Sequence, residues 1–282
     1  MIGLVVLGAV PASAAAALPV VDPVSVRGST NLPSGGSRTL ILTCPEPAVA
    51  LHAGASSELG SDSVPDSDPR RWSFRFTSDA GDPARRVRAV LRCVRLQLPP
   101  GLRGVRLTVG TVRRPDVFVV AGAARRVALT CQRGMIPTGW GLERGGAGQA
   151  IAVAAATPRR RGFVFRLENT GSAGASATPR IRCLKRSQRA RSGERHAFET
   201  RIARFDDSGA GARHACRRSE YSLSTGVSLD PSDDILLTGA MPAGARGGRW
   251  SFNRGGQAST NLVCLDRTSR FREEGRSFEA GP

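Results

Sequence analysis

The feature that most constrains this chain is a set of landmarks that recurs three times with nearly constant spacing. Each copy holds a cysteine, a glycine, a proline, an aromatic residue with a Phe two positions later, and a second cysteine. The positions are Cys44, Gly54, Pro69, Trp72 and Cys93; then Cys131, Gly141, Pro158, Phe163 and Cys183; then Cys216, Gly226, Pro242, Trp250 and Cys264. The step from first cysteine to glycine is 10 residues in every copy, and the cysteines of a copy are 49, 52 and 48 residues apart. Such a period indicates three copies of one folding unit of about 85 residues.

The six cysteines fall as one pair in each copy. No C-x-x-C pair occurs and no histidine keeps a fixed spacing to a cysteine, which argues against a metal site. Closing a loop of about 50 residues stabilises a small unit by roughly 4 kcal/mol in the chain-entropy model. We therefore expect one disulfide within each copy, and six reduced, buried thiols remain the alternative.

The N-terminus is typical of a secretory signal. Residues 2–10 are an uninterrupted apolar run, and Ala12-Ser13-Ala14 follows as an A-x-A cleavage pattern. The run is too short to span a bilayer, and the first basic residue is Arg27 rather than a residue before the run. We expect residues 1–16 to be a cleaved signal peptide. The mature chain is then secreted into an oxidising compartment with no transmembrane anchor.

The net charge of +18 raises the question of an anionic partner. Lys185 is the only lysine among 41 basic residues, a bias typical of arginine codons in a GC-rich genome. The arginines lie in scattered pairs and one triplet, and a single Tyr leaves few rings on which bases could stack. Nucleic acid is therefore a less favoured partner. A solvated basic surface and a surface that holds anionic polymers outside the cell both remain open.

Apolar and polar residues alternate in several short runs, which predicts β-strands. The clearest run is 72–77, where Trp72, Phe74 and Phe76 would face the core. We predict an all-β chain of three tandem sandwich-like repeats with five or six strands each. Whether the repeats sit as beads or close around a pseudo-threefold axis stays open. The predicted boundaries are 22–104, 105–195 and 196–282, with a flexible charged linker at 185–195 and a loose tail at 268–282.

Each landmark has a structural interpretation that requires no ligand. A fixed glycine indicates a backbone site with positive φ or a close approach to a neighbouring strand. A proline before the aromatic strand gives a rigid entry, and the aromatic rings with the disulfide form the core. Trp140 differs, because it lies in a Gly-rich turn of one copy alone. We take Trp140 as a possible exposed ligand contact.

With these residues in view, the chain resembles the disulfide-closed β repeats of secreted actinobacterial proteins. Cys44-Pro45 keeps the C-P pair, Gly139 and Gly141 keep the paired glycines, and 162–169 keeps the aromatic strand with its terminal Asn. The chain departs from the pattern where Cys131 and Cys216 lack a following proline, and where Phe163 replaces Trp. The resemblance spans nearly all of residues 24–267. It implies secretion and a β fold, and it carries over no catalytic residue.

No catalytic signature occurs. The chain has no G-x-S-x-G, H-E-x-x-H or P-loop, and its histidines, His52, His196 and His214, hold no repeated position. Asp62, Asp66 and Asp68 form one acidic loop that is a weak candidate for a cation site. We expect no cofactor, no metal and no enzyme activity. The leading hypothesis is a secreted binding or structural module that contacts anionic cell-envelope polymers or glycans. The alternatives are an envelope-polymer hydrolase, with two carboxylates far apart in sequence, and an extracellular DNA-binding protein.

Overall fold

The computed structural model describes residues 20–55, 62–98, 106–144, 150–189, 195–230, 235–266 and 270–272. The regular structure consists of antiparallel β-strands, so the predicted all-β class is confirmed. Within the described part, no helix has the length and apolar character that crossing a membrane requires. The expected signal peptide at 1–16 lies outside the described residues.

The first segment, residues 20–98, forms two groups of three strands. The strands are β1 (Val20–Leu32), β2 (Ser37–Thr43), β3 (Val49–Ala55), β4 (Asp62–Pro65), β5 (Arg71–Thr77) and β6 (Arg85–Gln97). β6 lies between β1 and β3, and β5 lies between β2 and β4. Along β5, Trp72, Phe74 and Phe76 are fully buried while Arg75 is exposed. The period-two prediction for this strand is confirmed, because side chains of a strand alternate between core and solvent.

The second and third segments pair their strands in the same way. The second segment, 106–185, contains β7 (Val109–Arg113), β8 (Val117–Val119), β9 (Ala124–Thr130), β10 (Met135–Arg144), β11 (Ile151–Arg159), β12 (Gly162–Asn169) and β13 (Ala175–Lys185). The third, 200–266, contains β16 (Thr200–Asp207), β17 (Gly211–Ala215), β18 (Glu220–Leu229), β19 (Leu237–Ala243), β20 (Gly247–Phe252) and β21 (Ala258–Asp266). The groups are β7-β13-β10 with β9-β12-β11, and β16-β21-β18 with β17-β20-β19. A register shift falls at Leu51, Thr138 and Leu223, each seven residues after the first cysteine.

The three predicted disulfides are present. They join Cys44 to Cys93, Cys131 to Cys183 and Cys216 to Cys264, with Cα–Cα distances of 5.7, 5.9 and 5.7 Å. In each segment the first cysteine directly follows the edge strand of one group, and the second lies in the central strand of the other group. Each disulfide therefore ties the two groups of its segment together.

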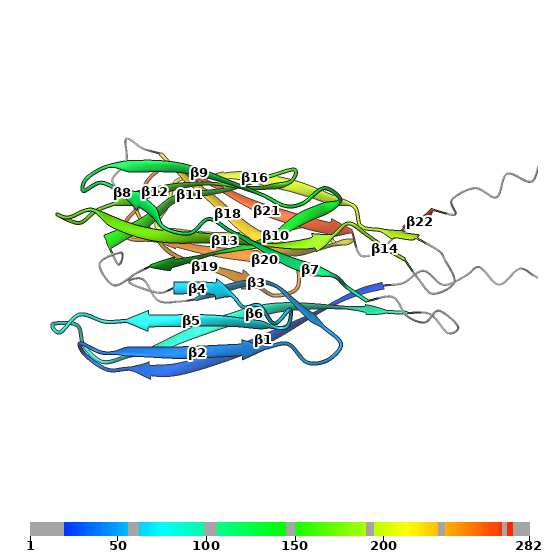
Figure 1. Ribbon diagram of the computed structural model, residues 1–282, viewed down its shortest axis with the longest axis horizontal. Coiled ribbons are helices and arrows are strands. Elements are labelled where there is room, and N and C mark those ends of the chain that lie inside the picture. Colours follow the sequence, from blue (N-terminus) through cyan, green and yellow to red (C-terminus); the bar gives the residue numbers. More distant parts are fainter. Residues whose placement is uncertain are drawn as a thin grey trace, which may run out of the picture.

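The segments meet at three places, which we call seams. At seam 1–2, β4 pairs with β10 through Ser63 and Leu142, which creates a seven-stranded sheet. At seam 2–3, β11 pairs with β18 through Ala155 and Ala156, which creates a six-stranded sheet. At seam 3–1, β19 packs beside β3, and the described residues of these two strands belong to different sheets (Figure 1). The first segment therefore contacts the last, and the segments are not beads on a string.

The repeated glycines lie at these seams. A Cβ atom at Gly54 would overlap the carbonyl oxygen of Ala240, and one at Gly141 would overlap that of Ser63. A Cβ at Gly226 would lie 2.8 Å from the carbonyl oxygen of Ala156. None of the three glycines has a positive φ. Of the two explanations that the sequence offered, close approach to a neighbouring strand is the one observed.

Four apolar clusters fill the interior. Three of them each belong to one segment and contain that segment's disulfide and aromatic strand, with Trp72, Phe163 and Trp250 at most 1 % exposed. The fourth, which we call the shared core, takes side chains from all three segments. Its members include the residue five positions after each first cysteine and the residue directly after each second cysteine: Val49, Ile136, Tyr221, Val94, Leu184 and Leu265. Corresponding side chains of the three segments therefore meet in one cluster.

Two sequence expectations need correction. The predicted linker at 185–195 and tail at 268–282 contain strands, because β14 (Ser187–Arg189), β15 (Arg195–Ala197) and β22 (Arg270–Arg272) form a small sheet. Residues 190–194 and 273–282 lie outside the described residues.

The expectation that Pro69 and Pro158 are equivalent is also wrong. Pro65 pairs with Trp72 as Pro158 pairs with Phe163, whereas Pro69 lies in the longer turn between β4 and β5.

Candidate functional site

Trp140 joins two segments instead of facing a ligand. Its ring is partly buried, and it meets Phe165 edge-on with ring centroids 6.1 Å apart. The indole N–H donates a 2.6 Å hydrogen bond to the carbonyl oxygen of Thr225 on β18. This corrects the expectation of an exposed contact residue. The Gly-rich motif around Trp140 is a strand, β10, which lies between β4 and β13 in the seven-stranded sheet.

His52 of the first segment also contacts Thr225, and it is unsuited to proton transfer. Only 1 % of the residue is exposed, and its Nε2 lies 3.0 Å from Oγ1 of Thr225. Burial, together with the nearby positive charge of Arg92, lowers the pKa of His52 to about 3. The imidazole is therefore neutral at ordinary pH and serves the contact between the first and third segments.

Two buried arginines form hydrogen bonds across seams 1–2 and 3–1. Arg92 and Arg182 each precede the second cysteine of their segment and are 1 % exposed. Arg92 donates to the carbonyl oxygens of Gly244 and Ala245, in the turn between β19 and β20. Arg182 donates to the carbonyl oxygens of Asp66 and Arg71, beside the turn between β4 and β5. Burial lowers the pKa of each guanidinium to about 10, so both arginines keep their charge at neutral pH. Alternation alone would have predicted solvated side chains at these positions.

The acidic loop at Asp62, Asp66 and Asp68 is used by the fold. Asp62 accepts the backbone N–H of Arg144 at 2.9 Å and lies 3.6 Å from its guanidinium. Asp66 and Asp68 accept backbone N–H groups within their own turn. The described residues bring together one group with metal-ligand spacing, and that group does not include these carboxylates.

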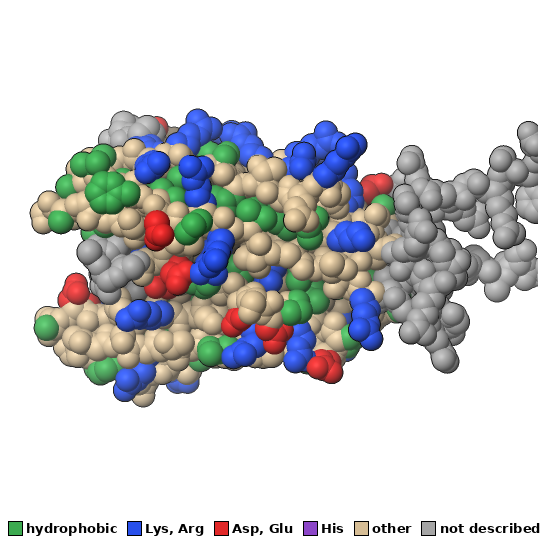
Figure 2. Space-filling model, viewed as in Figure 1, with side chains coloured by type: hydrophobic (Ala, Val, Ile, Leu, Met, Phe, Trp, Pro, Cys, Tyr) green, Lys and Arg blue, Asp and Glu red, His purple; other side chains and the backbone are tan. Residues whose placement is uncertain are grey.

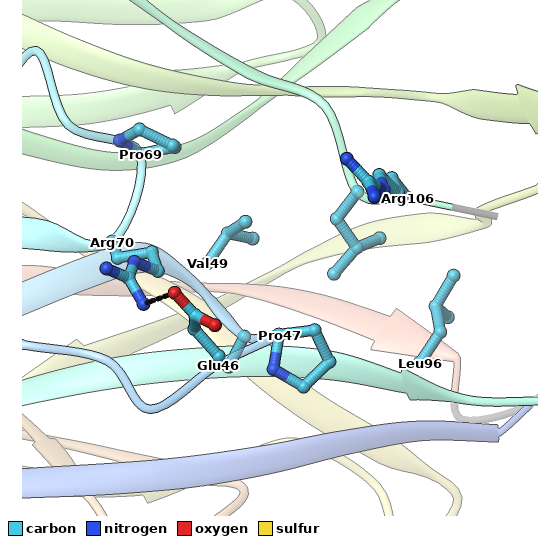
Figure 3. Close-up of a pocket in the computed structure, with 9 residues that line it drawn as sticks. Glu46, Pro47, Val49, Pro69, Arg70, Leu96 and Arg106 are labelled. Atoms are coloured by element: carbon cyan, nitrogen blue, oxygen red, sulfur yellow. Dashed lines mark hydrogen bonds and ion pairs between the residues drawn. The ribbon is translucent and has the colours of Figure 1, made fainter. Parts of the chain in front are cut away.

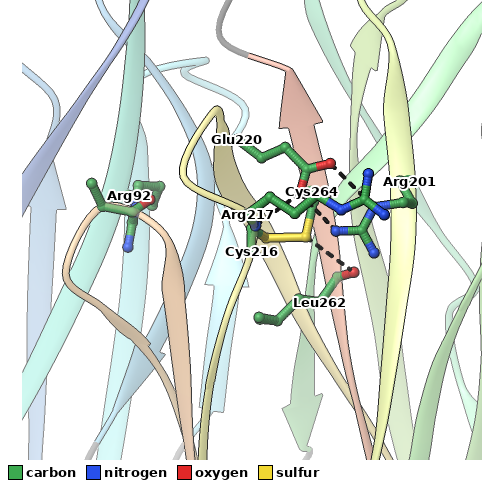
Figure 4. The surroundings of a disulfide bond; sticks show 8 residues. Arg92, Arg201, Cys216, Arg217, Glu220, Leu262 and Cys264 are labelled. Carbon is green, nitrogen blue, oxygen red and sulfur yellow. Dashed lines mark hydrogen bonds and ion pairs between the residues drawn. A yellow bond between two sulfur atoms is a disulfide. The ribbon is translucent and has the colours of Figure 1, made fainter.

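That group consists of Cys216, Glu220 and Cys264, and it is a structural cluster (Figure 4). The two sulfur atoms are bonded to each other, so neither is available as a thiolate ligand. Glu220 accepts two hydrogen bonds from Arg201, of 3.1 and 2.7 Å, and one from the backbone N–H of Arg217. These bonds lower the pKa of Glu220 and fix the start of β18.

His214 forms a pair with Asp207 that resembles part of a catalytic triad. Its Nε2 lies 2.7 Å from a carboxylate oxygen of Asp207, whose other oxygen accepts the hydroxyl of Thr260. The imidazole stacks on Phe205 with centroids 4.0 Å apart and lies near Trp250. Among the described residues, His214 has no hydrogen bond to a serine or cysteine that could act as nucleophile. The pair therefore caps the core of the third segment.

One hollow of about 390 Å³ opens at seam 1–2 (Figure 3). Its apolar lining includes Val49 and Leu96, which also pack in or against the shared core. Glu46 and Arg70 on its rim form an ion pair of 2.5 Å. The carboxylate of Glu46 and the guanidinium of Arg70 neutralise each other, and Arg106 adds one further exposed guanidinium to the lining.

A second hollow, of about 440 Å³, lies across the seven-stranded sheet where β5 ends and β13 begins. We call it the arginine hollow. Its charged lining residues are four arginines and two carboxylates: Arg75, Arg113, Arg144, Arg180, Asp116 and Glu143. Both signs of charge are visible on the face that Figure 2 presents, and basic side chains are spread over the whole of it.

The four arginines of this hollow fall into two pairs. Arg180 binds Glu143, and Arg144 lies against Asp62. Burial raises the pKa of Asp62, against the opposing effect of the N–H and charge of Arg144. Arg75 and Arg113 are exposed, and the guanidinium of neither makes a hydrogen bond or ion pair with another described residue, although the charge of Arg75 acts on Asp62. These two guanidinium groups are therefore available to a ligand.

This hollow is the best candidate functional site, and sequence reasoning missed it. Arg75 comes from the first segment and Arg113 from the second, so no local motif joins them. The scattered arginines that the sequence showed were the only signal. Comparison with protein-family models gives no match for this chain, and comparison with curated proteins gives none either.

Proposed function

We propose that the protein is a secreted, non-catalytic binding or structural module that contacts anionic cell-envelope polymers or glycans. Three disulfides support a location outside the reducing cytosol, because such bonds persist in oxidising compartments. Two of the three histidines, His52 and His214, and the carboxylates of Asp62 and Asp207 are used in contacts within the fold. The surface groups that remain to be explained are the exposed arginines.

The observation that carries the proposal is a set of exposed arginines without acidic partners. The sequence has 41 basic against 23 acidic residues. Exposed arginines from all three segments make no ion pair with another described residue: Arg27, Arg113, Arg126, Arg160, Arg213 and Arg249. Guanidinium groups bind carboxylate and phosphate through paired hydrogen bonds, which suits them to an anionic polymer.

We also propose that the chain is three copies of one unit of six strands, with β8 added in the second copy, closed around the shared core with pseudo-threefold symmetry. The matching strand order of the segments, the register shifts at corresponding residues and the glycine at each seam support it. A closed arrangement of this kind holds exposed side chains of different segments at fixed separations. A rigid array of charges suits a repetitive polymer.

Sedimentation with insoluble polymer tests the function. The purified protein is mixed with an insoluble polyuronate or polyphosphate and with a neutral glucan, at low and at high salt. We expect binding to the anionic polymers that weakens strongly as salt rises, since exposed charges are screened over about 10 Å at 0.1 M ionic strength. Equal binding to the neutral glucan, or binding that persists at high salt, would contradict the proposal.

A further inference from the structure

An exposed aromatic residue lies next to the arginine hollow. Phe118 on β8 is 51 % exposed, and the next outward residue, Val120, is 60 % exposed. Phe118 is the ladder partner of Ser176, which lines the hollow. Because ladder partners share a face of the sheet, Phe118 lies on the same face as Ser176, next to the hollow and outside its own lining.

The ring is held in place from beneath. A Cβ atom at Gly174 would overlap the ring of Phe118, so the ring packs directly over the backbone of that glycine. The guanidinium of Arg125 donates a 2.8 Å hydrogen bond to the carbonyl oxygen of Phe118. Phe118 is therefore supported by the residue before β13 and by β9, and about half of the residue stays exposed.

Arg75 lies across the sheet from Phe118, on β5, whereas Arg113 lies on β7, which pairs with the same edge of β13 as β8. Arg75 projects outward between the buried Phe74 and Phe76, so the core fixes its direction. Arg113 ends β7, where it pairs with Arg180 of β13. Since Glu143 binds Arg180 and Asp62 binds Arg144, Arg75 and Arg113 are the arginines left for an incoming anion, and the carboxylate of Asp116 lines the same hollow.

We propose that the arginine hollow binds one anionic sugar unit, with its carboxylate or phosphate on Arg75 and Arg113 and its ring on Phe118. This inference rests on the proposed function and names the site and the ligand class. A sugar presents an apolar face that packs on an aromatic ring, and its acid group matches the guanidinium fork. A hollow of about 440 Å³ suits a small ligand unit. Single-stranded nucleic acid, by contrast, needs successive stacking rings, and one exposed ring stands at this site.

Titration calorimetry with short oligosaccharides tests the proposal. The probes are a glucuronic acid oligomer, glucose 1-phosphate, a neutral glucose oligomer and a thymidine oligonucleotide. The variants are the R75Q/R113Q double variant, F118S, and a matched control, R27Q/R213Q, which removes two exposed arginines elsewhere. Thermal unfolding establishes that each variant is folded. The two sugar acids distinguish carboxylate from phosphate as the preferred group.

We expect R75Q/R113Q and F118S each to weaken binding of the acidic sugar about tenfold or more, and R27Q/R213Q to change it less than twofold, roughly. Equal losses in the control would overturn the hollow as the site while leaving the polymer-binding function intact. Unchanged affinity in F118S, or tighter binding of the oligonucleotide, would overturn the sugar assignment. Failure of the native protein to sediment with any anionic polymer would overturn the proposed function itself.

Discussion

The two seams that contain a buried arginine differ from the seam that lacks one. At seams 1–2 and 3–1, Arg182 and Arg92 reach across to backbone carbonyl groups of the neighbouring segment. At seam 2–3 the corresponding residue before the second cysteine is Val263. That seam has the longer strand pairing, through Ala155 and Ala156, while the first has one paired residue in each strand.

The difference shows two ways to satisfy polar backbone at the contact of two sheets. Where strands pair, the ladder itself satisfies the N–H and C=O groups. Where pairing is short or missing, a long side chain with several donors replaces it, and Arg182 also lies over the ring of Trp72, 5.8 Å from its centre. Trp140 adds a hydrogen bond to Thr225 on the seam without the arginine. The seams are therefore held by different interactions, although the strand order of the three segments is the same.

The largest effect should come from the seam glycines. Replacing Gly54 or Gly141 with alanine forces a methyl group into a backbone carbonyl oxygen of the next segment, so we expect a loss of about 3 kcal/mol in the free energy of unfolding. The change G226A should cost less, because its contact is looser. Urea unfolding measures the change. G81A is the control, since nothing lies near that position, and equal losses in G81A and G141A would show that the seams do not determine stability.

The buried arginines should come next. We expect R92A and R182A each to lower the free energy of unfolding by about 2–3 kcal/mol, because each removes two hydrogen bonds across a seam and the packing of a fully buried side chain. An exposed arginine such as Arg27 should change it by less than about 0.5 kcal/mol when replaced with alanine. Denaturant midpoints compare the three variants. A seam variant that matches R27A would remove the proposed role of the arginines.

The junction at His52 should make stability depend on pH. The folded chain holds the pKa of His52 at about 3, whereas its ordinary value is 6.5. Below pH 6.5 the unfolded chain binds a proton that the folded chain does not, so stability falls as pH drops toward 3. Between pH 7 and 5 this group should cost about 2 kcal/mol. H52Q should flatten that slope, and an unchanged slope would indicate that the imidazole is not buried in the folded chain.

The smallest effect should come from the indole of Trp140. W140F keeps an aromatic ring beside Phe165 and removes the hydrogen bond to Thr225. We expect a loss of about 1 kcal/mol in the free energy of unfolding. The substitution F118L, on an exposed ring, should leave stability unchanged and serves as the control. A W140F protein as stable as the native one would mean that seam 2–3 depends on strand pairing alone.

Sequence patterns predicted the features that form within one segment. Spacing predicted the disulfides, and alternation predicted the buried rings of β5 and its counterparts. The seams could not be predicted from the sequence, because they join residues that lie far apart in the chain, such as Gly54 and Ala240. Arg92 and Arg182 look like ordinary solvated positions until a neighbouring turn covers them. Their shared place before a cysteine was the one hint.

The candidate site was less predictable than the fold. Arg75 and Arg113 are two of many arginines, and only the pairing of β4 with β10 brings their segments into one sheet. Trp140 attracted attention because it broke the repeat, and the structure places it at a seam. A residue that departs from a repeat can therefore serve contact between copies as well as contact with a ligand.

Differential scanning calorimetry tests most directly whether the segments close around one shared core. A single cooperative unit gives a calorimetric enthalpy equal to the van't Hoff enthalpy. We predict one transition with a ratio near one, because the shared core draws side chains from every segment. Three separate transitions, or one broad transition with a ratio of about three, would show that the segments unfold independently and would contradict the closed arrangement.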